Sequence, residues 1–310
     1  MNLSGLLEII RRQDAYQALL DDLPSLRRGD VPAASLGLIR AARPYVTAAL
    51  ALDSGVPVLV VTARMDRAHD LAGQLRAWSP DLRILTCAEP EPIFYERAPW
   101  GKETIRIRLR VLAELASDPR SGTVIVASAR GLMQRTLPPG VLASQCMTLR
   151  QGERIPDGDP EMLLRRWLAM GYEPSPVVVE PGTYSRRGGI LDIYPLAAAW
   201  PVRIELWGDE IESLRTFDPA TQRSLNACPE VTITPTREAL PLYGPQAAER
   251  LAGWFASRPP EEDLPPGVLP DQVALRQGIA FPVLEYYLPW MYADPASLLD
   301  YLPAGALVLM

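Results

Sequence analysis

Two short runs, residues 56–63 and 123–128, are apolar at almost every position. Runs of this kind are typical of strands that are buried on both faces of a parallel sheet. Similar patterns predict further strands at 35–39 and 82–87, and helices at 1–20, 43–52, 65–78 and 102–116. Because strands alternate with helices, we predict an α/β domain built on a parallel sheet with helices on both sides.

Beyond residue 135 the alternation changes to one helix followed by short strands. The helix is predicted at 159–170, with Asp159 as N-cap, Pro160 in the first turn and Gly171 as the stop signal. One helix against an antiparallel sheet predicts an α+β unit inserted into the first domain.

The last third of the chain carries mixed signals. The pattern predicts an edge strand at 230–233, a helix at 246–256, a proline-rich exposed loop at 257–271 and the start of a buried strand at 305–310. That final strand looks cut short, which indicates part of a longer protein. The aromatic-rich segment 281–292 is either core or a partner contact, and core is favoured because aromatic clusters usually pack inside.

The stretch 202–217 has the pattern of a β-hairpin. Apolar and polar residues alternate over 202–207, as in a strand with one buried face. Gly208-Asp209 follows, and glycine at the first position of a two-residue turn favours a type II′ hairpin. The return strand is predicted from 210 to 217. The result is a sheet with one apolar face and one face that carries charges of both signs.

This register would place Glu205 directly opposite Glu212, which is unfavourable for two like charges. Either a β-bulge shifts the register or a cation lies between the carboxylates. The candidate cations are Arg203, Arg215 and the pair Arg186-Arg187. Beside that pair, Gly188-Gly189 allows a bulge or a close approach of two backbones. The charged face is then an ordinary solvated surface or, since arginine is enriched at protein interfaces, a docking surface.

The composition of the chain argues for a globular protein and against a membrane protein or a broad nucleic-acid-binding surface. The chain has 310 residues and is 48% hydrophobic, which suffices for two domains with buried cores. A net charge of −6 argues against a broad nucleic-acid-binding surface, although it leaves room for a local basic patch. No run approaches the roughly 20 apolar residues of a membrane span, and the start lacks the pattern of a signal peptide. We therefore expect no membrane interaction.

The residues that could carry chemistry are few and scattered. Cys87, Cys146 and Cys228 are far apart and odd in number, which indicates reduced thiols in a cytoplasmic protein. His69 is the single histidine, and nothing near it suggests a zinc site or a catalytic triad. With no paired carboxylates and no nucleophile–base motif in evidence, we predict no catalytic residues and no metal site.

Residues 37–47 stand where an α/β nucleotide-binding domain would have its phosphate loop. Such a loop needs several glycines, a lysine for the phosphates and a Ser or Thr for Mg²⁺. This stretch has one glycine, Gly37, and no lysine, and Pro44 lacks a backbone donor. Arg40 or Arg43 could hold a phosphate, but the backbone cradle is missing. We therefore expect no nucleotide cofactor.

Several short motifs occur in fixed order between residues 187 and 224. They are Arg-Gly-Gly-Ile-Leu-Asp-Ile-Tyr-Pro, Arg-Ile-Glu, Gly-Asp-Glu-Ile-Glu-Ser, Phe-Asp and Thr-Gln-Arg-Ser. In these motifs, and more weakly over nearly the whole chain, the sequence resembles the amino-terminal region of bacterial transcription-repair coupling factors. That region is similar to the excision-repair protein UvrB. Thr-Gln-Arg-Ser and the missing phosphate loop, which UvrB retains, favour the coupling factors.

The resemblance implies a degenerate helicase-like (RecA-like) domain, residues 1–134 and 225–310, with an inserted α+β domain at 135–224. In this family the inserted domain binds the repair ATPase UvrA. The family's recognition residues match Arg187, Arg203 and Glu205. A further family arginine falls on Ser185, next to Arg186, and another falls on Glu173. We therefore expect the UvrA-binding patch to consist of Arg186, Arg187, Arg203 and Glu205.

The resemblance also implies a role. The chain would dock UvrA at sites of stalled RNA polymerase in transcription-coupled nucleotide excision repair. The segment itself is expected to have no enzymatic activity and no cofactor, while ATP and Mg²⁺ would be bound by motor domains outside it. RNA polymerase and DNA would likewise be bound by other domains. The alternatives are a UvrB-type DNA-binding module, or part of an ATP-dependent DNA translocase.

Overall fold

The structure is a computed structural model that describes residues 3–28, 35–117, 121–257 and 268–310. They form two compact units. Unit 1 comprises Met1–Glu89, Glu114–Gln134 and Leu298–Met310, and unit 2 comprises Pro90–Ala113 and Arg135–Ser297. One of the points at which the chain passes from one unit to the other, between Ala113 and Glu114, falls within helix α5 (Lys102–Ala116). The domain boundaries expected at 134/135 and 224/225 stay a prediction, although strand pairing in unit 2 continues past residue 224.

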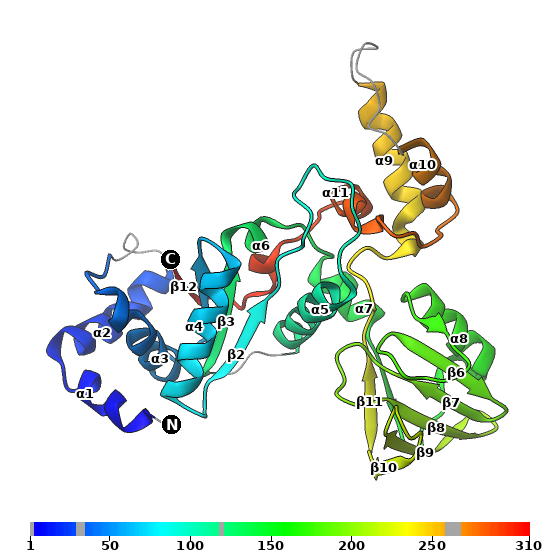
Figure 1. The fold of residues 1–310 in the computed structure, drawn as a ribbon, viewed down its shortest axis with the longest axis horizontal. Coiled ribbons are helices and arrows are strands. Elements are labelled where there is room, and N and C mark those ends of the chain that lie inside the picture. The colour runs from blue at the N-terminus through cyan, green and yellow to red at the C-terminus, as the bar shows by residue number, and fades with distance from the viewer. Residues whose placement is uncertain (1–2, 29–34, 118–120, 258–267) are drawn as a thin grey trace. The chain divides into compact units, whose positions relative to one another are not determined.

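Unit 1 is built on a four-stranded parallel sheet with strand order β12-β1-β3-β2 (Figure 1). The strands are β1 (Val58–Thr62), β2 (Arg83–Cys87), β3 (Thr123–Ser128) and β12 (Leu307–Leu309). Every residue of β3 is buried, as its continuous apolar sequence predicts. The predicted α/β class and the strands near 56–63, 82–87, 123–128 and 305–310 are confirmed.

The helices of unit 1 pack their apolar residues into one core with this sheet. Helices α3 (Arg43–Asp53) and α4 (Met65–Trp78) confirm the predicted ranges and bring Leu50 and Leu75 into that core. The shorter helices are η2 (Arg40–Ala42), α6 (Ala129–Met133) and η6 (Leu298–Tyr301).

Two predictions for unit 1 are wrong. The helix expected at 1–20 is interrupted, because η1 (Ser4–Leu6) and α1 (Leu7–Arg11) end before α2 (Asp14–Arg28) begins. The strand expected at 35–39 does not form. Its backbone has no ladder partner among the residues that the structure describes, and the Leu38 N–H donates locally to the Leu36 carbonyl at 2.9 Å. An apolar run predicts a strand only where a neighbouring strand can accept its hydrogen bonds.

Unit 2 contains a six-stranded sheet in the order β10-β9-β8-β7-β6-β5. Its strands are β5 (Glu173–Pro174), β6 (Thr183–Arg187), β7 (Ile190–Ile193), β8 (Val202–Trp207), β9 (Glu210–Phe217) and β10 (Ser224–Ala227). All pairs are antiparallel except β5 with β6. Strand β4 (Met147–Arg150) pairs with β11 (Glu230–Ile233) as a separate two-stranded sheet, which confirms the strand predicted at 230–233.

Glycine turns fix the strand register around the predicted site. Gly208 has a φ of +64°, whereas Asp209 is not among the described residues with positive φ, as a type II′ turn requires. Gly188 has a φ of +62° in the turn between β6 and β7. A Cβ on the adjacent Gly189 would lie 3.0 Å from the Leu206 carbonyl oxygen, so the predicted close backbone approach is confirmed.

One helix covers the apolar face of this sheet. Helix α8 (Pro160–Ala169) begins as predicted, with the Asp159 carboxylate accepting from the Glu161 N–H at 2.9 Å. Gly171 follows its end with a φ of +93°. Trp167 is fully buried in the core that the sheet and the helix share. The expected α+β unit, one helix against an antiparallel sheet, is therefore present.

The remaining helices of unit 2 are α7 (Pro139–Gln145), α9 (Gly244–Ala256), α10 (Val268–Arg276) and α11 (Leu288–Met291), with the short turns η3 (Pro156–Gly158), η4 (Pro241–Tyr243) and η5 (Leu284–Tyr287). The aromatic segment 281–292 is core rather than free surface, since Tyr287 is fully buried and Trp290 contacts Trp254 of α9. Most of the loop predicted at 257–271 lies outside the described residues. Its end is helical, because Pro270 falls in the first turn of α10, where proline is tolerated.

Candidate partner-binding face of the inserted sheet

Strand pairing gives the six-stranded sheet two chemically different faces. Apolar partners form one row across β7, β8 and β9 and are buried against α8: Leu191, Ile204 and Leu214. Residues next to this row in sequence point to the opposite side, because side chains alternate along a strand. We call this side the charged face. Its charged residues are Arg187, Asp192, Arg203, Glu205 and Arg215, and Ser213 lies among them.

Asp192 is the centre of the charged face. Its side chain is 2% exposed and accepts hydrogen bonds from two arginines on neighbouring strands. The Arg203 Nε–H and Nη2–H donate to its two oxygens at 2.7 and 2.9 Å. The Arg187 Nη2–H donates to Asp192 Oδ2 at 2.5 Å. Because a buried carboxylate needs compensation, the two guanidinium groups fix its position and it fixes theirs.

Arg203 is held from several sides. Its guanidinium lies over the Phe217 ring, 4.8 Å from the centroid, and Phe217 is fully buried. The hydrogen bonds to Asp192 raise the pKa of Arg203, and the nearby Glu205 carboxylate adds to this. Only 16% of the Arg203 side chain is exposed, whereas 55% of the Arg187 side chain is. Arg187 is therefore the more accessible of the two cations.

Glu205 pairs with Ser213 and not with Glu212. The register between β8 and β9 shifts between Glu205 and Leu206, so the predicted bulge is confirmed as the solution to the like-charge problem. The Ser213 hydroxyl donates to Glu205 Oε2 at 2.5 Å, and Glu212 is exposed.

Arg186 does not share the charged face with the other three predicted residues. It pairs in register with Leu191 of the apolar row, and its guanidinium makes an ion pair with Glu161 in the first turn of α8. Adjacent residues of a strand point to opposite faces, so Arg186 and Arg187 cannot both lie on one side of β6. The expectation of a single four-residue patch is corrected: Arg187, Arg203 and Glu205 share one face, and Arg186 points to the opposite side of the sheet.

Sequence reasoning missed two charged residues of this face, Asp192 and Arg215, as site residues. Asp192 stands inside the apolar run Ile-Leu-Asp-Ile, and a carboxylate in such a strand signals a buried ion pair. The sequence suggests Arg215 only as a possible counter-ion for the two glutamates. Its place on the face follows from direct pairing with Arg203, which the bulge at Glu205 determines.

Residues 37–47 form no glycine cradle. Gly37 is not among the described residues with positive φ, and a Cβ there would touch nothing within 4 Å. The chain continues into η2 and α3, with Pro44 at the start of α3. A cavity of about 950 Å³ is lined by this segment, by the end of β1 and by β12. Arg40 and Arg43 are among its lining residues. Among the described residues, no lysine lines it.

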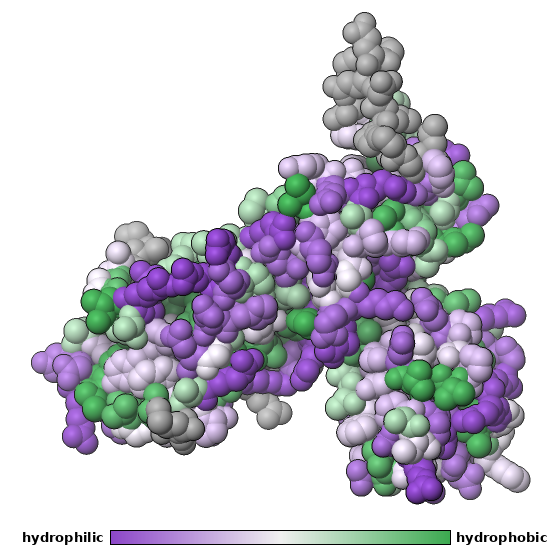
Figure 2. All heavy atoms as spheres, viewed as in Figure 1, coloured by the Kyte–Doolittle hydropathy of each residue, from purple (hydrophilic) through white to green (hydrophobic). Residues whose placement is uncertain are grey.

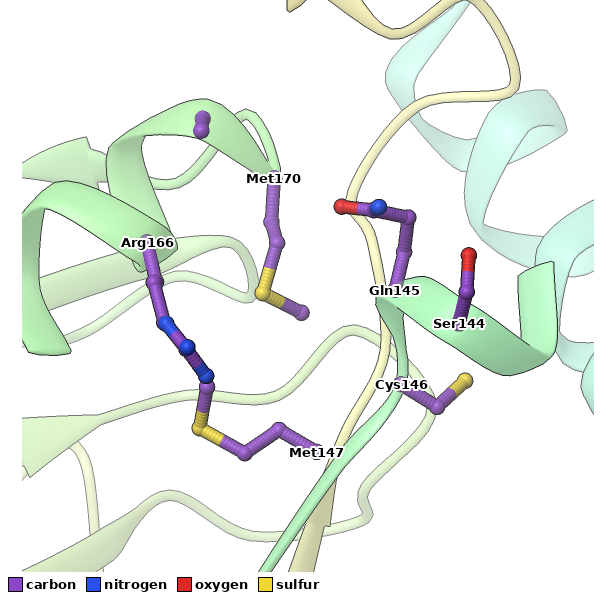
Figure 3. A pocket seen from close by; sticks show the side chains of 7 residues that line it. Ser144, Gln145, Cys146, Met147, Arg166 and Met170 are labelled. Carbon is purple, nitrogen blue, oxygen red and sulfur yellow. The ribbon is translucent and has the colours of Figure 1, made fainter. Parts of the chain in front are cut away.

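A smaller cavity of about 360 Å³ lies in unit 2 between α8 and the junction of α7 with β4. Figure 3 shows Arg166 of α8, Met170 directly after the end of α8, and Cys146 at the junction among the residues that line it. Burial raises the pKa of the Cys146 thiol, which makes it a poor nucleophile near neutral pH. This cavity therefore offers no activated cysteine.

The described ranges contain neither a metal cluster nor a membrane-spanning helix. No group of three or more His, Cys, Asp or Glu side chains there could hold a metal ion. No helix in that part of the chain is both long enough and apolar enough to cross a bilayer. The view in Figure 2 shows hydrophilic residues interspersed with smaller hydrophobic groups over the surface of both units.

Comparison with known proteins places this geometry in a family. Residues 147–238 match the family model of the UvrB interaction domain, a range that includes the whole charged face. The chain is 30% identical to the transcription-repair-coupling factor of Bacillus subtilis (strain 168) over 97% of the chain and 26% of that protein. It is 35% identical to the factor of Mycobacterium tuberculosis (strain CDC 1551 / Oshkosh) over 99% of the chain and 25% of that protein. It is 26% identical to the transcription-repair-coupling factor of Escherichia coli (strain K12) over 88% of the chain and 23% of that protein.

The chain thus spans about a quarter of the length of the curated relatives that it matches. The match extends over both units and is not confined to the inserted sheet. The chain belongs to the transcription-repair-coupling factors, as the resemblance of its motifs predicted, and it contains their UvrB interaction domain.

Proposed function

We propose that this chain docks the excision-repair ATPase UvrA through the charged face, and so links UvrA to stalled RNA polymerase in transcription-coupled nucleotide excision repair. One observation carries the proposal. Arg187, Arg203 and Glu205, the positions expected to recognise UvrA, lie on one face of one sheet within the matched UvrB interaction domain.

The charged face has unused hydrogen-bonding capacity where a partner can reach it. Arg187 donates one bond to Asp192, and the rest of its half-exposed guanidinium is available. A guanidinium edge of this kind can hold a carboxylate with two parallel N–H···O bonds. Glu205 uses Oε2 for Ser213, which leaves Oε1 as an acceptor. The face therefore offers a donor and an acceptor in fixed positions, as specific docking requires.

The proposal is tested by measuring the affinity of UvrA for the chain and its variants. Truncating a central interface arginine often costs about 2 kcal/mol, which corresponds to roughly 30-fold weaker binding. We expect a loss of that order for Arg187→Ala and a measurable loss for Glu205→Ala. The matched control is Arg165→Ala, an exposed arginine of α8 without an ion pair among the described residues. Wild-type affinity in both charged-face variants would sink the proposal.

The chain is further proposed to bind no nucleotide, because residues 37–47 supply neither a backbone cradle nor a phosphate-binding lysine. Because a cavity of about 950 Å³ lies beside these residues, nucleotide binding has to be tested by titration. Titration with a fluorescent ATP analogue and Mg²⁺ should show no saturable binding, and magnesium-dependent saturation would overturn this part. ATP hydrolysis, translocation on DNA and contact with RNA polymerase are proposed for portions of the relatives that this chain does not match.

A further inference from the structure

Arg215 is the one cation of the charged face that the proposed function leaves unused. It lies on β9 directly opposite Arg203, so the two side chains point to the same side of the sheet. Arg215 is exposed, and its side chain makes no hydrogen bond or ion pair with any residue that the structure describes. A free guanidinium on a face where the other two are held calls for a physical explanation.

Arg203 has few donors left for a partner. Its Nε and Nη2 donate to Asp192, its Nη1 lies 3.5 Å from the Gln222 carbonyl oxygen, and Phe217 covers one side of its plane. The side chain is only 16% exposed. Arg203 therefore acts on the position of Asp192, and through it on Arg187, and it presents no free edge to a carboxylate from outside.

Charge is unbalanced beside Arg215. Two arginines opposite each other on neighbouring strands repel, and Asp192 compensates Arg203 and Arg187 but makes no bond to Arg215. The other carboxylate of the face, Glu205, is held by Ser213. An added carboxylate next to Arg215 would therefore be attracted by the excess positive charge and would gain an unused fork of donors.

We propose that Arg215 contacts the docking partner directly and takes an aspartate or glutamate carboxylate of that partner, while Arg203 is a positioning residue. The inference rests on the proposed docking of UvrA. It assigns the direct cationic contacts to Arg187 and Arg215, which flank Arg203 on strands β6 and β9 of the sheet.

The test compares Arg215→Gln with Arg165→Gln in the full chain, with UvrA as the titrant. Both changes remove one exposed, unpaired arginine, but Arg165 lies on the helix that covers the opposite face of the sheet. We expect Arg215→Gln to weaken binding about ten-fold and to make it less sensitive to salt. Arg165→Gln should change the affinity less than about two-fold, as rim or remote charges do.

Thermal melts separate folding from binding. The Arg215 side chain has no hydrogen-bond or ion-pair partner among the described residues, so Arg215→Gln should melt like wild type. Suppose that the wild-type chain binds UvrA, that Arg187→Ala weakens this binding and that Arg215→Gln leaves it unchanged. The assignment of Arg215 is then overturned, while the proposed function stands. If the wild-type chain does not bind UvrA at all, both are overturned. Weakening by Arg215→Gln and Arg165→Gln to the same extent also contradicts the inference, because it indicates a general charge effect.

Discussion

Asp192 should be the residue whose change most disturbs the charged face. Asp192→Asn keeps the size of the side chain and one oxygen acceptor, but it removes the negative charge between Arg187 and Arg203. Three charge-assisted hydrogen bonds depend on that carboxylate, whose side chain is 2% exposed. The change therefore leaves Arg203, largely buried, without a counter-ion.

The size of the loss follows from how exposed the two cations are. Removing one partner of a fully buried ion pair costs about 3–5 kcal/mol. The Arg187 side chain is more than half exposed and can be rehydrated, so it contributes little to the loss of stability. The Arg203 side chain is only 16% exposed, so most of the loss comes from Arg203. The asparagine oxygen keeps one neutral hydrogen bond. We therefore expect Asp192→Asn to lower the free energy of unfolding by about 2–3 kcal/mol.

Urea unfolding followed by tryptophan fluorescence measures this loss, since Trp167 lies in the same core as the sheet. Glu161→Gln is the control, because it breaks the exposed ion pair of Arg186 and should cost less than about 1 kcal/mol. Adding Arg203→Gln to Asp192→Asn should cost little more, since the uncompensated cation is then gone. Two results would refute a buried, uncompensated Arg203 as the cause. One is a loss of stability in Asp192→Asn within about 0.5 kcal/mol of that in Glu161→Gln, and the other is full additivity of Asp192→Asn and Arg203→Gln.

Three further predictions concern other parts of unit 2. Gly208→Ala should destabilise the chain by about 1–2 kcal/mol, because Gly208 has a φ of +64°, and an unchanged urea midpoint would contradict it. Arg108 and Glu238 form a bidentate ion pair whose side chains are 1% and 0% exposed. Arg108→Met alone should therefore lower the free energy of unfolding by about 3–5 kcal/mol, and the double variant Arg108→Met with Glu238→Leu should recover most of that loss. Equal losses in the single and the double variant would argue against an uncompensated buried charge. Burial raises the pKa of Cys146 and Cys228, so iodoacetamide should modify them more slowly than free cysteine at pH 8, and faster as the pH rises or urea is added. Rates equal to free cysteine in the folded chain would show that the thiols are not protected.

Much of the fold could be predicted because single segments carry their own signal. The run at 123–128 is apolar throughout and forms the fully buried β3. The start of α8 is predicted by Asp159 and Pro160, whose roles are local. The segment at 35–39 shows the limit of such signals. It is as apolar as a short strand, but strand formation depends on a neighbour elsewhere in the chain, and within the described ranges no strand pairs with it.

The candidate site was predictable in kind but not in arrangement. The like charges at Glu205 and Glu212 required a bulge or a cation, and the bulge is what formed. Alternation along β6 is enough to separate Arg186 from Arg187 on sequence grounds, since neighbours on a strand face opposite ways. The role of Asp192 could not be derived in this way. It depends on the register of β6, β7 and β8 together, which brings arginines from two other strands onto one carboxylate.

The central claim is that the charged face binds UvrA, and isothermal titration of UvrA with this chain and with Arg187→Ala tests it most directly. We expect saturable binding by the wild-type chain that weakens as salt is added, and roughly 30-fold weaker binding by Arg187→Ala, whose fold remains intact. Equal affinities for the two chains, or no heat of binding from the wild-type chain at any concentration reached, would contradict it.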